Sequence, residues 1–211
     1  MTPEIFFEKI KQYKQKAHTL LEDKLHHNIT RGMAHSISGY VEDLFSVYVA
    51  SNINRSDVHY FVDKVVSFWP SNGGKAKSIK PDLLVVENNV ATHYCDMKTD
   101  LGYRRDMESY LKERNELIEE IKGREAWISF PGNTKQIKFS KEIKYRVVVI
   151  FGWNINAALL KQNIAAANSL PNVELYVLFK PKIKGDLSTE DNVTISHEDF
   201  NRLSQAFNFN P

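Results

Sequence analysis

The chain has 211 residues, of which 42% are hydrophobic, and this is long enough for one well-buried core. A net charge of +2 permits a nucleic-acid partner without requiring one, and the one cysteine, Cys95, excludes an internal disulfide framework and a cysteine-rich zinc site. No stretch reaches ~18 uninterrupted apolar residues, and the N-terminus lacks a basic-then-apolar signal. We therefore expect a cytoplasmic protein that does not span a membrane.

Two helices are expected at the start of the chain. Residues 3–26 have helical periodicity. Residues 35–51 predict a second helix, in which Glu42 and Asp43 interrupt the apolar run. The polar face of the first helix carries four lysines, Lys9, Lys11, Lys14 and Lys16. That face is either an ordinary solvated surface or one that faces phosphates.

Residues 58–69 (VHYFVDKVVSFW) are rich in β-formers and predict one strand, followed by a loop, PSNGGKAKS. The loop is not a nucleotide-binding loop, because Trp69 stands five positions before Gly74 where a glycine is needed, and Ala76 follows Lys75. Three lysines on or beside the loop are candidate phosphate contacts: Lys75, Lys77 and Lys80.

Residues 80–98 (KPDLLVVENNVATHYCDMK) predict two strands separated by Asn88-Asn89, residues that tolerate the left-handed conformation. The elements expected after them are a helix at 104–122, a hairpin at 127–139, a central strand at 145–153, a helix at 154–168, a strand at 173–179 and a helix at 197–206. This order predicts an α/β fold (an α+β mixed sheet) covered by helices. We expect a single domain, 1–211, with helices in 1–52 packed on a core of about 36–179 and a tail at 180–211.

Charged residues gather at both ends of the expected hairpin. Asp96 and Lys98 share one face of their strand, because residues two apart point the same way. A plain two-residue turn would pair Asp82 with Cys95 and put the two aspartates on opposite faces, whereas an odd loop or one bulge would pair Asp82 with Asp96. Directly opposed Cβ atoms are only ~5 Å apart, and two carboxylates that close repel unless a cation lies between them. A metal site here therefore requires an odd loop or a bulge.

Two carboxylates and a backbone carbonyl form an oxygen-only site suited to Mg²⁺, with Mn²⁺ as a possible substitute. Such a metal stabilises charge on a phosphate and lowers the pKa of a bound water, and Lys98 on the same face would orient that water. This set of groups fits hydrolysis of a phosphodiester.

Pro81-Asp82, followed by Asp96-Met97-Lys98 with the two aspartates 14 residues apart, resembles the PD-(D/E)xK signature of the restriction-endonuclease-like nucleases. The resemblance implies a restriction-endonuclease-like core with an αβββαβ element order. It also implies that Asp82, Asp96 and the Met97 carbonyl bind Mg²⁺, that Glu42 assists through a metal or a water, and that Lys98 positions the attacking water. Asp43 is a weaker competitor for the role of Glu42, because it points about 100° away around the helix.

The same resemblance implies a Mg²⁺-dependent endonuclease that cuts double-stranded DNA, most simply a type II restriction enzyme acting as a homodimer. Three alternatives stay open. The chain is a DNA-repair, junction-resolving or phage-type nuclease of the same fold, a catalytically inactive DNA-binding or interaction module, or an unrelated metal-free α/β domain with Asp82 and Asp96 on opposite faces.

Two further segments are candidate DNA contacts: Tyr103, Arg104 and Arg105 after the motif, and Lys182 and Lys184 after the last long strand. An ordinary helix start or solvated loop explains each equally well. Cys95 with His93 is disfavoured as a thiol nucleophile, because a lone cysteine in such a strand is usually buried. His26-His27 lacks metal-ligand spacing and is expected to be exposed.

Overall fold

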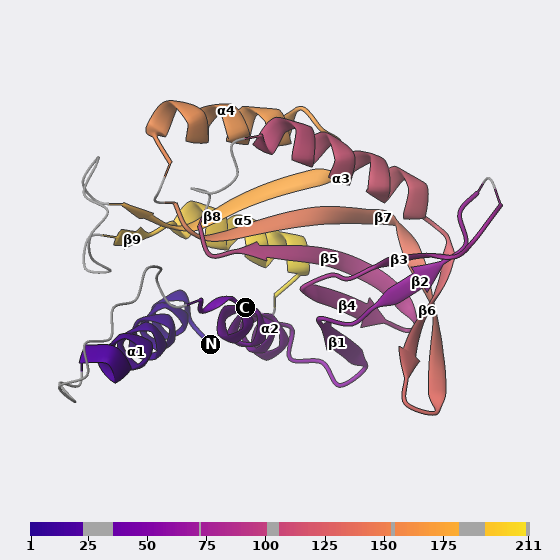
Figure 1. Ribbon diagram of the computed structural model, residues 1–211, viewed down its shortest axis with the longest axis horizontal. Coiled ribbons are helices and arrows are strands. Elements are labelled where there is room, and N and C mark those ends of the chain that lie inside the picture. The colour runs from indigo at the N-terminus through magenta and orange to yellow at the C-terminus, as the bar shows by residue number, and fades with distance from the viewer. Residues whose placement is uncertain (23–35, 72, 101–105, 153–154, 182–192, 210–211) are drawn as a thin grey trace.

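The computed structural model describes residues 1–22, 36–71, 73–100, 106–152, 155–181 and 193–209. A mixed β-sheet lies between two layers of helices (Figure 1). The helices are α1 (Pro3–Glu22), α2 (Ser38–Ile53), α3 (Met107–Ile121), α4 (Ala157–Asn168) and α5 (His197–Phe207). The strands are β1 (Val58–Val62), β2 (Val66–Phe68), β3 (Lys77–Ile79), β4 (Leu83–Glu87), β5 (Val90–Lys98), β6 (Glu125–Phe130), β7 (Asn133–Phe151), β8 (Val173–Pro181) and β9 (Val193–Ile195).

Strand order along the sheet is β1-β4-β5-β7-β6-β2-β3, with β8 also paired to β7 and β9 to β8. The pairs β5–β7 and β7–β8 are parallel, and the other pairs formed by the described strands are antiparallel. Each parallel step crosses through a helix, α3 and then α4, as parallel neighbours require. The expected α/β class with a mixed sheet is confirmed.

Alternate residues of the central strands enter two separate cores. Leu83 and Val85 of β4 pack with α1, α2 and α5, whereas Leu84 and Val86 pack with α3 on the other face. In Figure 1, α3 and α4 lie above the sheet and α1 and α2 below it. On the lower side, Phe6 of α1 is fully buried against rings that include Phe179. This burial is the physical reason for the apolar stripe along the first helix.

Several predicted boundaries are wrong. The single strand expected at 58–69 is two strands, because Asp63 adopts a left-handed backbone (φ 54°) and ends β1. The loop expected after it contains β3. The hairpin at 127–139 and the strand at 145–153 share one long strand, β7, whose first half pairs with β6 and whose second half lies between β5 and β8. Strand β9 was not foreseen.

The β4–β5 hairpin contains a bulge. Its turn has two residues, Asn88 and Asn89, both with positive φ (50° and 63°), as in the type I′ turns that suit a twisted hairpin. Val86 pairs with Ala91 but Val85 pairs with His93, so Thr92 is an extra residue in β5.

The bulge changes which residues face each other. On the side of the bulge away from the turn, Leu83 pairs with Cys95. Continuing that register by one position places Asp82 opposite Asp96. A metal site at this hairpin required an odd loop or a bulge, and the hairpin has a bulge after its two-residue turn.

In the part of the chain that the structure describes, no helix combines the length and apolar character needed to cross a bilayer.

Candidate metal centre

Asp82 stands immediately before β4, where the chain enters the sheet. One of its carboxylate oxygens, Oδ2, accepts the backbone N–H of Met97 at 2.6 Å. The N–H and C=O of a strand residue point the same way, so the Met97 carbonyl also points toward this connection. Continued two positions past the Leu83–Cys95 pair, the register would place Pro81 opposite Met97, and proline has no N–H with which to occupy that carbonyl. The sequence Pro-Asp thus presents one carboxylate and leaves one carbonyl available.

Asp96 lies on β5, facing α3. Its Oδ2 contacts Lys98 Nζ at 2.6 Å and accepts a hydrogen bond from the Tyr110 hydroxyl. Burial acts to raise the pKa of Asp96, but the ammonium of Lys98 and the hydroxyl of Tyr110 outweigh it and hold that pKa below its usual value. Asp96 is therefore the carboxylate that stays ionised.

Asp82 shows the opposite behaviour. Burial first, and the neighbouring charge of Asp96 second, raise the pKa of Asp82 to about 7, and the two side chains share a hydrogen bond. A carboxyl with that pKa holds a proton in mildly acidic solution. Two carboxylates this close repel each other unless a proton or a cation lies between them.

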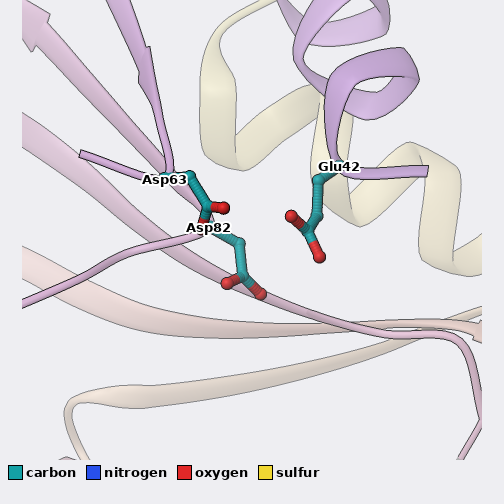
Figure 2. A group of neighbouring side chains, drawn as sticks. All are labelled: Glu42, Asp63 and Asp82. Atoms are coloured by element: carbon teal, nitrogen blue, oxygen red, sulfur yellow. The ribbon is translucent and has the colours of Figure 1, made fainter. Parts of the chain in front are cut away.

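Two further carboxylates approach from the other side. Glu42 of α2, Asp63 after β1 and Asp82 each offer an oxygen, and these oxygens lie within 4.8 Å of one another. Figure 2 shows the carboxylate of Glu42 directed toward Asp82, with Asp63 beside Asp82. Partial burial and the charge of Asp63 raise the pKa of Glu42.

Asp63 was missed in the sequence analysis, where it stood inside an apparently continuous strand. The signal was its position between two β-rich runs, since aspartate tolerates the left-handed conformation that interrupts a strand. Its N–H donates to the Asp82 carbonyl at 3.3 Å, and its carboxylate contacts Lys80 at 2.9 Å. These contacts fix Asp63 beside Asp82.

The charges of this cluster suit a divalent cation. When all four carboxylates (Glu42, Asp63, Asp82 and Asp96) are ionised they face two ammonium groups (Lys80 and Lys98), and two negative charges are left. Around an octahedral Mg²⁺ with bonds of about 2.1 Å, neighbouring ligand oxygens are about 3 Å apart and opposite ones about 4.2 Å. The oxygens of Glu42, Asp63 and Asp82 lie within 4.8 Å of one another, an upper limit slightly wider than that spacing.

The structure therefore brings the predicted residues together: Glu42, Asp82, Asp96, Met97 and Lys98 meet where β4 begins and β5 ends. Asp43 is exposed. Cys95 is fully buried, and burial raises the pKa of its thiol to about 12, which makes it a poor nucleophile.

The predicted DNA contacts are only partly described. Lys75 is exposed near the tip of the β2–β3 hairpin, whereas Lys77 pairs with Glu120 at 2.6 Å and Lys80 with Asp63. Tyr103, Arg104, Arg105, Lys182 and Lys184 lie outside the described residues, as do His26 and His27.

The β2–β3 hairpin is connected to the candidate site at both of its ends. It leaves the site after Asp63 and returns to it at Lys80, and Figure 1 shows its tip extending beyond the rest of the sheet. Residues 64–80 include four lysines and no acidic residue. Trp69 on this hairpin is 60% exposed, with its ring centroid 5.7 Å from that of Trp127.

Comparison with known proteins adds no relative: no family model, no curated protein and no solved structure matches the chain. The function has to be inferred from the geometry of the site.

Proposed function

We propose that this protein is a Mg²⁺-dependent endonuclease that hydrolyses phosphodiester bonds of double-stranded DNA, as a PD-(D/E)xK nuclease. The observation that carries the proposal is the Thr92 bulge, which pairs Asp82 with Asp96 and so gathers two carboxylates, Lys98 and the Met97 backbone at one point. Were Thr92 instead paired with Val85 in an unbroken ladder, Asp82 would lie opposite Cys95 and the motif would be divided between two faces of the sheet.

The topology supports the same proposal. The elements α2, β1, β4, β5, α3 and β7 follow the αβββαβ order of a restriction-endonuclease-like core. Within it, β1, β4 and β5 form an antiparallel meander, and β5 continues through α3 into the parallel strand β7. The site lies where β4 begins, at the end of this core that α2 also reaches.

In this proposal Asp82, Asp96 and the Met97 carbonyl hold Mg²⁺, or Mn²⁺ in its place, and Glu42 assists directly or through a water. The bound cation stabilises negative charge on the scissile phosphate and lowers the pKa of a coordinated water. Lys98 supplies the positioned ammonium, which orients the attacking water and offsets the charge that develops on the phosphate. Asp82, whose pKa is raised, would have to be deprotonated to hold the cation.

The proposed cleavage of double-stranded DNA implies a DNA-contacting surface and a homodimer. Lys75 and its neighbours on the β2–β3 hairpin would contact phosphates on one side of the scissile bond. Cutting both strands of a duplex needs two active sites, and a homodimer supplies them with one gene. A type II restriction enzyme is the member of the class that combines these properties in one domain.

A plasmid cleavage assay tests the proposal. Purified protein is incubated with mixed-sequence plasmid DNA in Mg²⁺ or in EDTA, beside the variants Asp96→Asn and Asp57→Asn. Asp57 is an exposed carboxylate paired with Arg55, so its loss should leave cleavage intact. Discrete fragments that require both Mg²⁺ and Asp96 support a restriction enzyme, and a smear with the same requirement supports a less specific nuclease. No cleavage, with no cation binding by calorimetry, would favour the inactive DNA-binding module.

A further inference from the structure

Two buried tyrosines lie next to Asp96 in a chain of hydrogen bonds. Tyr110 of α3 is 5% exposed and Tyr145 of β7 is 2% exposed. The Tyr110 hydroxyl donates its proton to Asp96 Oδ2, so the Tyr145 hydroxyl, 2.6 Å away, must donate to Tyr110. The result is a directed chain of hydrogen bonds that ends on one oxygen of the proposed metal ligand.

This chain selects which oxygen of Asp96 is available. The same atom, Oδ2, also contacts Lys98 Nζ at 2.6 Å, so two donors occupy Oδ2. The ring of Tyr110 lies beneath Lys98 as well, with the ammonium 6.0 Å from its centroid. Tyr110 therefore contacts both Asp96 and Lys98, and the Tyr110 and Lys98 contacts with Asp96 both fall on Oδ2.

The tyrosines themselves are held firmly. The guanidinium of Arg114 lies 5.0 Å from the Tyr110 ring centroid and 6.0 Å from that of Tyr145, and Tyr94 packs on Tyr145 with centroids 4.8 Å apart. Burial and the nearby charge of Asp96 raise the pKa of Tyr110, which keeps its hydroxyl protonated as a donor. A fixed donor restricts the rotation of the carboxylate that it contacts.

We propose that Tyr110, supported by Tyr145, is a positioning residue that fixes the Asp96 carboxylate for cation binding. The inference rests on the proposed function only in taking Asp96 as a metal ligand. It adds a residue outside the PD-(D/E)xK motif, on a different element, to the set that determines cation affinity.

The test measures Mn²⁺ affinity by calorimetry on the full chain without DNA. Tyr110→Phe removes the hydroxyl and keeps the ring beneath Lys98, and we expect about 10-fold weaker Mn²⁺ binding, the scale typical of groups that orient a ligand. Tyr145→Phe keeps the hydrogen bond from Tyr110 to Asp96, and we expect about 2-fold weaker binding by the same reasoning. With DNA, Tyr110→Phe should raise the Mg²⁺ concentration for half-maximal cleavage more than it lowers the rate at saturating Mg²⁺.

A matched control separates positioning from stability. Tyr176 is equally buried, and its hydroxyl donates to Glu174 at 2.7 Å, away from the candidate site. Tyr176→Phe therefore removes a comparable tyrosine–carboxylate hydrogen bond and should leave Mn²⁺ affinity unchanged. If Tyr110→Phe folds poorly, the double variant Tyr110→Phe/Tyr145→Phe removes both hydroxyls and leaves no buried hydroxyl without its partner.

The outcomes distinguish this inference from the proposed function. Wild-type Mn²⁺ affinity in Tyr110→Phe, or an equal loss in Tyr176→Phe, would overturn the positioning role and leave the nuclease proposal standing. Mn²⁺ binding that survives Asp96→Asn would place the cation on Glu42, Asp63 and Asp82 alone and would also overturn it. A wild-type protein that binds no Mn²⁺ would refute the metal site and the positioning role together.

Discussion

Asp63 and Asp82 lie side by side at the ends of two antiparallel strands, joined by a backbone hydrogen bond of 3.3 Å from the Asp63 N–H to the Asp82 carbonyl. Their carboxylates meet that of Glu42 within 4.8 Å. The proposed cation site would therefore include a carboxylate outside the motif.

Replacing Asp63 tests that conclusion. Asp63→Asn keeps a residue that tolerates the left-handed backbone and removes one charge. We expect about 10-fold weaker Mn²⁺ binding by calorimetry. Stability should change little, because the Asp63–Lys80 pair is largely exposed. Asp57→Asn is the control, and equal Mn²⁺ affinity in the two variants would remove Asp63 from the site.

The raised pKa of Asp82 predicts a pH-dependent stability of the metal-free protein. Between its ordinary value of 3.8 and about 7, folded Asp82 holds a proton that the unfolded chain has released. The free energy of unfolding from this group is therefore greatest in acid and falls as the pH rises through about 7. Thermal unfolding in EDTA should show a lower melting temperature at about pH 8 than at about pH 5.5.

The variant Asp82→Asn is the matched comparison for that titration. Asparagine keeps an oxygen to accept the Met97 N–H and has no proton to release. Its melting temperature should change less between the two pH values than that of the wild type. If both proteins show the same decrease, the titrating group is not Asp82.

Lys98→Ala should reduce DNA cleavage by at least about 100-fold, the usual contribution of a positioned proton-transfer or charge-stabilising group. DNA affinity, measured with Ca²⁺ in place of Mg²⁺, should stay close to that of the wild type, because Asp96 remains fixed by Tyr110. Lys112→Ala removes an exposed lysine of α3 that pairs with Glu108, and it should cut normally. Cleavage at the wild-type rate by Lys98→Ala would refute the mechanism.

Lys75 gives a prediction about DNA binding alone. Lys75→Ala should weaken binding equally for different sequences and reduce the slope of log affinity against log salt by about 1, the effect of one lost phosphate contact. Lys77 is the comparison, since its ammonium already pairs with Glu120 at 2.6 Å and Lys77→Ala should change the slope less. Salt titrations by fluorescence anisotropy measure both slopes. An unchanged slope for Lys75→Ala would mean that the hairpin does not contact DNA.

The turn at Asn88-Asn89 predicts a stability effect. Asn89 has φ 63°, so Asn89→Val should destabilise the fold by about 1–2 kcal/mol, the cost of a left-handed β-branched residue. Asn89→Gly should be neutral or slightly stabilising, because glycine suits the second position of a type I′ turn. Urea unfolding measures both changes. If Asn89→Val were as stable as the wild type, the turn would have to accommodate valine by changing its backbone conformation.

The sequence was sufficient to predict that Asp82, Asp96 and Lys98 lie close together, because the Pro-Asp and Asp-x-Lys pairs stand at the ends of two recognisable strands. It also predicted that an odd loop or a bulge had to exist. It did not locate the bulge, since Thr92 differs in no local way from its neighbours and its extra position follows from pairing across the sheet.

The missed features share a cause. Asp63 lies where β1 leaves the sheet beside Asp82, a relation between strands that no pattern in residues 58–69 contains. The continuity of β7 depends likewise on three different neighbours along its length. The helical spacing of Tyr110 predicts only a core position. Its hydroxyl contacts Asp96 because α3 packs on the sheet, which the sequence pattern does not show.

Thr92 contributes no ligand and no charge to the candidate site, yet its place outside the β4–β5 ladder decides which residues of the hairpin face each other. Its hydroxyl hydrogen-bonds the Val85 carbonyl at 3.3 Å, within the hairpin. If Thr92 paired with Val85 in an unbroken ladder, Asp82 would lie opposite Cys95, and Asp96 and Lys98 would turn toward the other face of the sheet. Deleting one residue here would instead give a plain two-residue hairpin that keeps Asp82 opposite Asp96. The charged residues of the motif therefore do not by themselves determine whether they meet, and a homologue with one residue fewer here would keep the same pairing without a bulge.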